Sequence, residues 1–79
     1  YNNPATCGGV SIEPDTVARL AELPNVVGIK DSSGDLQNTI ELIRRTPADR
    51  FSVLNGRDTL IYSALAMGAQ GAIPASANI

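Results

Sequence analysis

Lys30 is the residue whose position most directly suggests chemistry. It is the only lysine of the chain, and it ends the apolar run Val26-Val27-Gly28-Ile29, which is typical of a strand buried on both faces. An amine held against apolar walls is desolvated, which favours its neutral form. A neutral amine attacks a ketone to form a Schiff base, and the resulting iminium is an electron sink. The structural alternative is an ion pair with a neighbouring carboxylate, or a stem that carries the charge to solvent.

Other polar groups are predicted to lie close to this lysine. Tyr1 is placed at a strand end, where a phenol can pass a proton to and from substrate oxygen, although it can also serve only in packing. The hydroxyls and amides of 32–34 (Ser-Ser-Gly) can hold a carboxylate, or they can cap the next helix. Gly56, within Asn55-Gly56-Arg57-Asp58, lets a substrate approach the backbone closely, or it simply forms a turn.

These groups must be positioned by alternating strands and helices. The pattern predicts strands over 26–30, 51–55 and 71–76, with Tyr1-Asn2 as the tail of a fourth. It predicts helices over 13–23, 34–45 and 57–69. Pro14 suits a first helical turn, Gly68 suits a helix C-cap, and Pro74 indicates a strand end or an irregular backbone.

The strand ends are spaced by roughly 20 to 25 residues, the length of one strand–helix unit. Repetition of this unit predicts an α/β fold with a parallel sheet covered by helices. An open Rossmann-like sheet and a closed (β/α)8 barrel both fit the pattern, and both place function at the carboxyl ends of strands. Lys30, Asn55-Gly56 and Ala75-Ser76 are therefore expected to converge on one mouth.

Composition argues against several classes of function. The net charge is -2, no basic cluster exceeds Arg44-Arg45, and aromatic residues make up 4%, so no nucleic-acid partner is predicted. The sequence has neither an apolar run of membrane-helix length nor a signal-peptide pattern. Cys7 is alone and histidine is absent, so neither a metal site nor a cofactor is predicted, and a cytoplasmic location is the simplest expectation. Both ends read as cut through structure, which predicts a piece of a larger protein.

Four blocks of sequence carry a resemblance to a known family. They are Y-N-x-P-A-x-x-G at 1–8, N-V-V-G-I-K-D-S-S-G-D at 25–35, V-L-N-G-x-D at 53–58 and G-A-x-G-A-I-x-x-x-A-N at 68–78. In this order they resemble the dihydrodipicolinate synthase/N-acetylneuraminate lyase family, which consists of Schiff-base, pyruvate-handling class I aldolases on a (β/α)8 TIM barrel. The resemblance implies that residues 1–79 form about the second half of the barrel, from the end of strand five through strand eight.

The resemblance also implies roles for individual residues. Lys30 takes the position of the Schiff-base lysine, and Tyr1 takes that of the proton-shuttle tyrosine. Ser32, Gly56 and Asp58 match substrate-lining positions, and Ile73 matches a residue whose backbone carbonyl lies beside the imine. The first four strands of the barrel, which are not in this sequence, should supply the residues that bind the pyruvyl carboxylate. A homotetramer without a cofactor, acting on a 2-keto acid (pyruvate) and an aldehyde, is expected.

Two departures bear on the substrate. Dihydrodipicolinate synthases carry an arginine two residues after the Tyr-Asn-x-Pro proline, where this chain has Thr6, and threonine lacks the bidentate fork of arginine. Sialic acid lyases usually carry an acidic residue where this chain has Thr59. A lyase or aldolase for another 2-keto acid, such as a keto-deoxy sugar acid, is therefore predicted, with Asp58 accepting hydrogen bonds from its hydroxyls. The alternatives are condensation of pyruvate with aspartate semialdehyde, or a non-catalytic ligand-binding protein.

Overall fold

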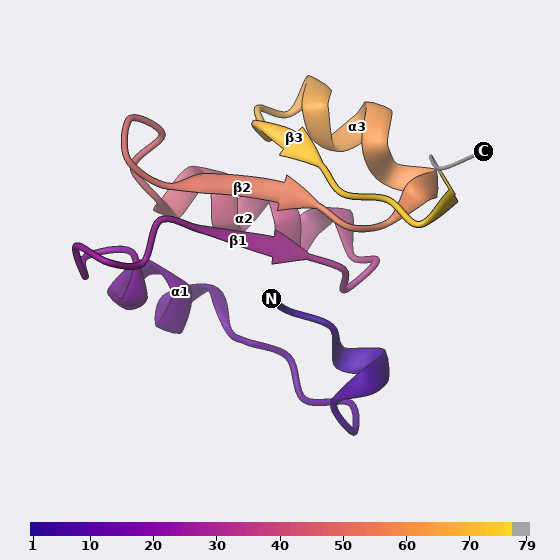
Figure 1. The fold of residues 1–79 in the computed structure, drawn as a ribbon, viewed down its shortest axis with the longest axis horizontal. Coiled ribbons are helices and arrows are strands. Elements are labelled where there is room, and N and C mark those ends of the chain that lie inside the picture. Colours follow the sequence, from indigo (N-terminus) through magenta and orange to yellow (C-terminus); the bar gives the residue numbers. More distant parts are fainter. Residues whose placement is uncertain (77–79) are drawn as a thin grey trace.

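The computed structural model describes residues 1–76 of the chain as a parallel sheet with helices (Figure 1). The strands are parallel and lie in the order β1 (Gly28–Asp31), β2 (Ser52–Asn55) and β3 (Gly71–Ala72). The α-helices are α1 (Pro14–Leu20), α2 (Leu36–Arg45) and α3 (Ile61–Ala66), and the 3₁₀ helices are η1 (Pro4–Thr6) and η2 (Asp58–Leu60). The predicted parallel α/β arrangement is confirmed. Within residues 1–76, no helix is both long and apolar enough to cross a membrane.

The register brings the predicted strand ends together. Lys30 lies opposite Leu54, and Leu54 in turn lies opposite Gly71. The predicted fourth strand is present as one parallel bridge between Asn2 and Asp31, so the N-terminal segment runs beside the end of β1 (Figure 1). The third strand ends at Ala72 and is therefore shorter than the predicted 71–76. Pro74 follows two residues later and has no backbone N–H to donate to a strand partner.

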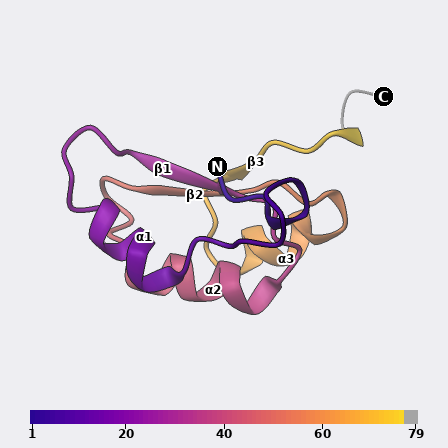
Figure 2. The same cartoon turned by 90° about the horizontal axis from the view of Figure 1, so that it is seen from below.

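Within residues 1–76 the first strand is buried on one face and not, as predicted, on both. All three α-helices lie on one side of the sheet (Figure 2), so burial alternates along β1: Ile29 and Asp31 are buried, Gly28 is exposed and Lys30 is half-buried. Alternation follows from the two-residue repeat of a strand. Lys30 therefore lies on the face that no helix covers. The core is on the opposite side, formed by Val17, Ala21, Ile29, Leu42, Phe51 and Val53.

Local sequence explains where the helices begin and end. Pro14 occupies the first turn of α1 as predicted, and the Asp35 carboxylate caps α2 by accepting from the Asn38 backbone N–H at 3.2 Å. The single helix predicted over 57–69 is instead two elements, the 3₁₀ helix η2 followed by the shorter α-helix α3. Gly68 follows α3 with a φ of 109°, which only glycine adopts readily, and the Ala69 N–H returns to the Ala64 carbonyl at 3.0 Å. The C-cap itself is Met67, and Gly68, which was predicted as the C-cap, lies one residue beyond it.

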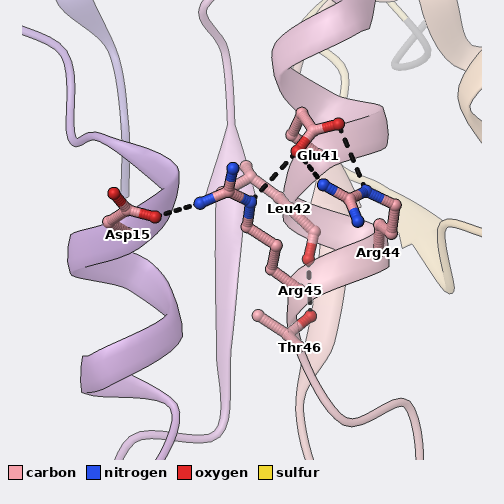
Figure 3. A network of polar contacts seen from close by, with 6 residues as sticks. All are labelled: Asp15, Glu41, Leu42, Arg44, Arg45 and Thr46. Carbon is pink, nitrogen blue, oxygen red and sulfur yellow. Dashed lines mark hydrogen bonds and ion pairs between the residues drawn. The ribbon is translucent and has the colours of Figure 1, made fainter.

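A surface network ties α1 to α2 (Figure 3). Arg45 on α2 pairs with Asp15 on α1 and also donates to Glu41 on its own helix at 3.0 Å. Arg44 pairs with the same Glu41 at 2.8 Å. Hydrogen bonds from Arg44, and secondarily from Arg45, lower the pKa of the Glu41 carboxyl. This network lies on the helices rather than at the carboxyl ends of the strands, so it serves the scaffold.

Candidate active site

A pocket of about 310 Å³ opens at the carboxyl ends of the strands. It is lined by Tyr1, Asn3, Lys30, Ser32, Gly56, Arg57, Ile73, Pro74 and Ala75. Five of the residues singled out from the sequence are thus brought together: Tyr1, Lys30, Ser32, Gly56 and Ile73. Thr6 and Asp58 do not line the pocket. Convergence of this kind is expected where parallel strands end at one edge of a sheet.

Lys30 and Tyr1 lie next to each other in the lining of the pocket. The Lys30 Nζ lies 4.5 Å from the centroid of the Tyr1 ring, which is a cation–π distance. Within residues 1–76 Lys30 makes no salt bridge, so the ion-pair alternative weighed from the sequence is not what holds it. The strand alternation turns its stem toward the uncovered face, away from the apolar core. The apolar walls expected around this amine are therefore not supplied by the helices.

The Tyr1 phenol lies in a polar environment that favours its ionised form. Asn3 Nδ2 donates to the Tyr1 oxygen at 3.1 Å. The pKa of the phenol is lowered from its ordinary value, first by the Ser32 hydroxyl, then by Asn3, with the charge of Lys30 adding to the effect. The Tyr1 side chain is largely exposed, so solvent screens these interactions. A phenol with a lowered pKa is better suited to exchange protons near neutral pH.

Ser32 presents a buried hydroxyl with no full hydrogen bond. Its Oγ has no partner of good geometry within residues 1–76, so its approach to Tyr1 is a weak contact rather than a formed bond. The helix-capping alternative is not realised, because Asp35 caps α2 instead. A buried hydroxyl left unsatisfied costs about 1–3 kcal/mol. Ser32 is therefore available to a ligand that brings its own polar group.

Gly56 is required by the packing of Lys30 and Ser32. A Cβ placed on Gly56 would overlap Ser32 Oγ and would lie 2.8 Å from Lys30 Cε. The turn predicted at this position is also present, because the Asn55 side chain accepts from the Arg57 N–H at 3.3 Å and donates to the Arg57 carbonyl. The predicted turn is therefore present, and the missing side chain also leaves room for Lys30 and Ser32, whereas close approach of a substrate stays a prediction.

Asp58 is engaged with the backbone that follows β3. Its two carboxylate oxygens accept from the N–H groups of Ala75 at 3.1 Å and Ser76 at 2.7 Å. Hydrogen bonds from Ser76, and then from Ala75, lower the pKa of this carboxyl. Asp58 thereby joins the loop after β2 to the loop after β3, next to the pocket wall formed by Ile73 and Ala75.

Thr6 lies apart from the pocket. It is exposed in η1, and its hydroxyl donates to the Asn3 carbonyl at 3.2 Å. Its substrate role therefore stays a prediction. Within residues 1–76, no group of three or more His, Cys, Asp and Glu side chains is placed to hold a metal ion. A second hollow, of about 370 Å³, lies on α1 beside Leu20 and Leu23, and none of the predicted site residues lines it.

Sequence reasoning missed four residues at or below the pocket. Asn3 and Arg57 line it, and Asn2 and Asp31 are buried beneath it, each 1% exposed. Asn3 fills the variable position of the Tyr-Asn-x-Pro motif, so the motif gives it no weight. An aspartate directly after a strand lysine was the available signal for Asp31. Ala77 and Asn78, which end the fourth motif block, lie outside the described residues.

The fold and the pocket define an α/β protein with a candidate site at the carboxyl ends of parallel strands. Comparison with known proteins then gives the family: the chain belongs to the dihydrodipicolinate synthetase family, which matches it over residues 1–79. The resemblance predicted from the four motif blocks is confirmed.

Three relatives illustrate the family. The chain is 48% identical over 79 residues to 4-hydroxy-tetrahydrodipicolinate synthase 2 of Clostridium acetobutylicum, covering all of this chain and 27% of that protein. It is 34% identical, with a TM-score of 0.90, to a prophage protein of the dihydrodipicolinic acid synthase family from E. coli K12 solved in complex with pyruvate, covering 99% and 27%. It is 36% identical, with a TM-score of 0.79, to the 2-keto 3-deoxygluconate aldolase of Picrophilus torridus, covering 87% and 25%. The chain spans about a quarter of the length of each.

Proposed function

We propose that this chain carries the reactive lysine of a Schiff-base (class I) aldolase or lyase that acts on a 2-keto acid. The observation that carries the proposal is the placement of the Lys30 amine against the Tyr1 phenol in one pocket with Ser32 and Gly56. Membership of the dihydrodipicolinate synthetase family supports it, as do relatives named for a synthase and for an aldolase.

The chemistry follows from an amine and a phenol side by side. The neutral Lys30 amine attacks the ketone carbon of the 2-keto acid, and the adduct loses water to give an iminium. Loss of a proton from the adjacent carbon gives an enamine, which attacks the carbonyl carbon of an aldehyde, whose oxygen takes up a proton. Water then hydrolyses the iminium and returns the free amine. Cleavage runs these steps in reverse, and Tyr1 gives and takes the protons.

The remaining pocket residues take supporting roles in this proposal. The unsatisfied Ser32 hydroxyl hydrogen-bonds a substrate oxygen, and Gly56 keeps space beside the lysine. Ile73 contributes the wall beside the imine. Asp58 does not line the pocket, and it supports the pocket wall by holding the Ala75 and Ser76 N–H groups; its acceptance of hydrogen bonds from substrate hydroxyls stays a prediction.

We infer that the sheet belongs to a (β/α)8 barrel, of which residues 1–79 supply the part from the end of strand five through strand eight. The one-sided helical cover supports this, because in a barrel the helices lie outside and the other face of the sheet lines the interior. The pyruvyl carboxylate is then gripped by strands outside this chain. A cytoplasmic homotetramer is the assembly expected from the family resemblance.

Two substrate classes compete for the aldehyde position. Thr6 in place of an arginine favours an uncharged, hydroxylated partner, as in a keto-deoxy sugar acid. Arg57 favours an aldehyde that bears a carboxylate, such as aspartate semialdehyde, because it lines the pocket and makes no salt bridge within residues 1–76. Screening 2-keto acids for pyruvate release, beside condensation with aspartate semialdehyde, separates the two. Efficient condensation that is lost in Arg57→Gln assigns the carboxylate-bearing class.

The lysine chemistry itself is tested by reductive trapping. The intact protein, treated with pyruvate and borohydride, is expected to gain a covalent adduct that peptide mass spectrometry assigns to Lys30. Lys30→Arg keeps the positive charge but forms no such adduct, so it is the matched control. An adduct at another residue, or none, refutes the catalytic proposal and leaves a ligand-binding protein.

A further inference from the structure

The position of Tyr1 is set by its neighbour, Asn2. The Asn2 N–H donates to the Lys30 carbonyl at 2.9 Å, and the Ser32 N–H donates to the Asn2 carbonyl at 2.8 Å. These two bonds make the single parallel bridge beside β1. One bridge is too short to hold a strand by itself. Something further must fix the segment that presents the phenol to Lys30.

The Asn2 side chain supplies that fixation inside the protein. Its Nδ2 donates to Asp31 Oδ1 at 3.0 Å and to Ser11 Oγ at 3.2 Å, while its Oδ1 accepts from the Ile12 N–H at 3.0 Å. The amide therefore has a donor side and an acceptor side that are both used, which fixes its orientation.

Asp31 in turn is anchored to the start of α2. Its carboxylate accepts from Thr39 Oγ1 at 2.7 Å, from the Ser33 hydroxyl at 3.1 Å and N–H at 3.2 Å, and from Asn38 Nδ2 at 3.4 Å. With Asn2, five donors converge on one buried, acceptor-only group. An asparagine here would turn its own N–H donors toward some of these donors, so only a carboxylate satisfies the arrangement.

Asp31 does not contact the pocket directly. Successive side chains of a strand point to opposite faces, so Lys30 lies on the open face while Asp31 lies among the helices. Asp31 is absent from the pocket lining, whereas Tyr1 and Lys30 are part of it. The Asp31 backbone is joined to Lys30 and Ser32 along the chain, whereas its side chain is linked to Tyr1 through Asn2 and the backbone bridge.

We propose that Asp31 and Asn2 are positioning residues, a buried pair that holds the Tyr1 phenol in place over the Lys30 amine. The inference rests on the proposed function, because it assigns the pair to the proton-transfer step of that reaction. Borohydride trapping after a long incubation with pyruvate reports the amount of iminium on Lys30, whereas kcat reports the rate of the proton transfers assigned to Tyr1. Loss of the pair is therefore expected to spare trapping at Lys30 while slowing the steps that need the phenol.

The test compares Asp31→Asn and Asn2→Ala with Ser11→Ala in the intact enzyme. Ser11→Ala removes another Asn2 contact but leaves the pair, so it is the matched control and is expected to keep wild-type kinetics. Both pair variants are expected to retain borohydride trapping with pyruvate and a nearly unchanged KM for the keto acid. Their kcat is expected to fall about 100-fold or more, the contribution of a positioned general acid–base group.

A spectroscopic readout separates positioning from a merely structural role. Tyrosinate absorbance that disappears in Tyr1→Phe reports the ionisation of Tyr1. In the pair variants this ionisation is expected to move up toward the ordinary pKa of 10.0, because the phenol leaves Ser32 and Lys30. Asn2→Ala leaves the Asp31 carboxylate its other donors, so it provides the test if Asp31→Asn fails to fold.

Two results overturn the inference. One is wild-type kcat and wild-type Tyr1 titration in folded Asn2→Ala. The other is a parallel loss of trapping and kcat in a folded pair variant, which makes the pair a general structural element. Absence of trapping in the wild-type enzyme is a different outcome, because it refutes the proposed function itself.

Discussion

At the scale of single residues, the pocket is arranged around small spaces and unsatisfied groups. Lys30 Cε and Ser32 Oγ occupy the volume that any side chain at position 56 would need. Ser32 Oγ is buried without a full partner, and the Tyr1 phenol is held by Asn3. A single carbon atom added at Gly56 would therefore displace Lys30, the proposed nucleophile.

Replacing Gly56 with alanine is expected to disable the lysine. The new Cβ must push away both Ser32 and Lys30, and displacement of a reacting group by about 1 Å can cost about 100-fold in rate. The measurement is the rate of pyruvate trapping at Lys30 in the intact enzyme. Gly71→Ala is the control, because its Cβ meets only a Leu54 methyl group at 3.3 Å. Equal trapping in Gly56→Ala and wild type contradicts the prediction.

Asp58 is expected to make stability depend on pH. Its hydrogen bonds with Ser76 and Ala75 lower the folded-state pKa below the ordinary value of 3.8, so the stabilisation is present above that value. It is lost as pH falls through the lower folded-state pKa. Asp58→Asn should therefore be less stable than wild type at neutral pH, and the gap should narrow in acid. Urea unfolding at neutral pH and at about pH 3 checks this, and a gap that widens in acid contradicts it.

At the scale of elements, α2 is the centre of the scaffold. It packs on the sheet through Leu42, which is fully buried, and it is tied to α1 by the Arg45–Asp15 pair (Figure 3). Its N-terminal turn also carries Asn38 and Thr39, which anchor Asp31 below the pocket. The Asp31 carboxylate consequently links α2 to Asn2 and, through it, to Tyr1.

Truncating Leu42 to alanine is expected to destabilise the protein by about 2–5 kcal/mol, because a buried isopropyl group is removed from a close-packed core. The matched control is Leu65→Ala on α3, where the side chain is 46% exposed and the expected cost is below about 1 kcal/mol. Chemical denaturation of the intact protein measures both. Similar losses for the two variants refute the assignment of Leu42 to the core.

At the scale of the whole molecule, one face of the sheet lacks helical cover. The chain leaves Val27 69% exposed and Ile73 52% exposed, and both lie on or beside the strands. Ile29 and Val53, in contrast, are buried on the helical side. An uncovered apolar face and unpaired strand edges are features that favour association.

The 79-residue chain, expressed alone, is expected to be aggregated or partly molten and to show no imine-dependent turnover. The proposed barrel would cover the open face, and without it Lys30 lacks the walls that would desolvate its amine. Circular dichroism with a thermal melt, paired with pyruvate trapping, measures both properties. A cooperative, monomeric melt together with an adduct at Lys30 contradicts this expectation.

Features that depend on local pattern could be predicted from the sequence. The alternation of apolar strands and amphipathic helices predicted the parallel α/β order, and Pro14 and Gly68 predicted helix ends, because these signals act within a few residues. Parallel strands also share one edge for their carboxyl ends, so the meeting of Tyr1, Lys30, Ser32 and Gly56 was expected from strand order, whereas Ile73 was singled out only by the family resemblance.

Features that depend on contacts between distant segments became visible only in the folded chain. An apolar run reads the same whether one or both faces are covered, so the one-sided cover of β1 could not be read from Val26–Ile29. The convergence of five donors on Asp31 joins residues from position 2 to position 39, and the Asp58 bonds reach to Ser76. Hydrogen bonds of this kind leave no periodic trace in the sequence, because their geometry exists only once the strands and helices have packed.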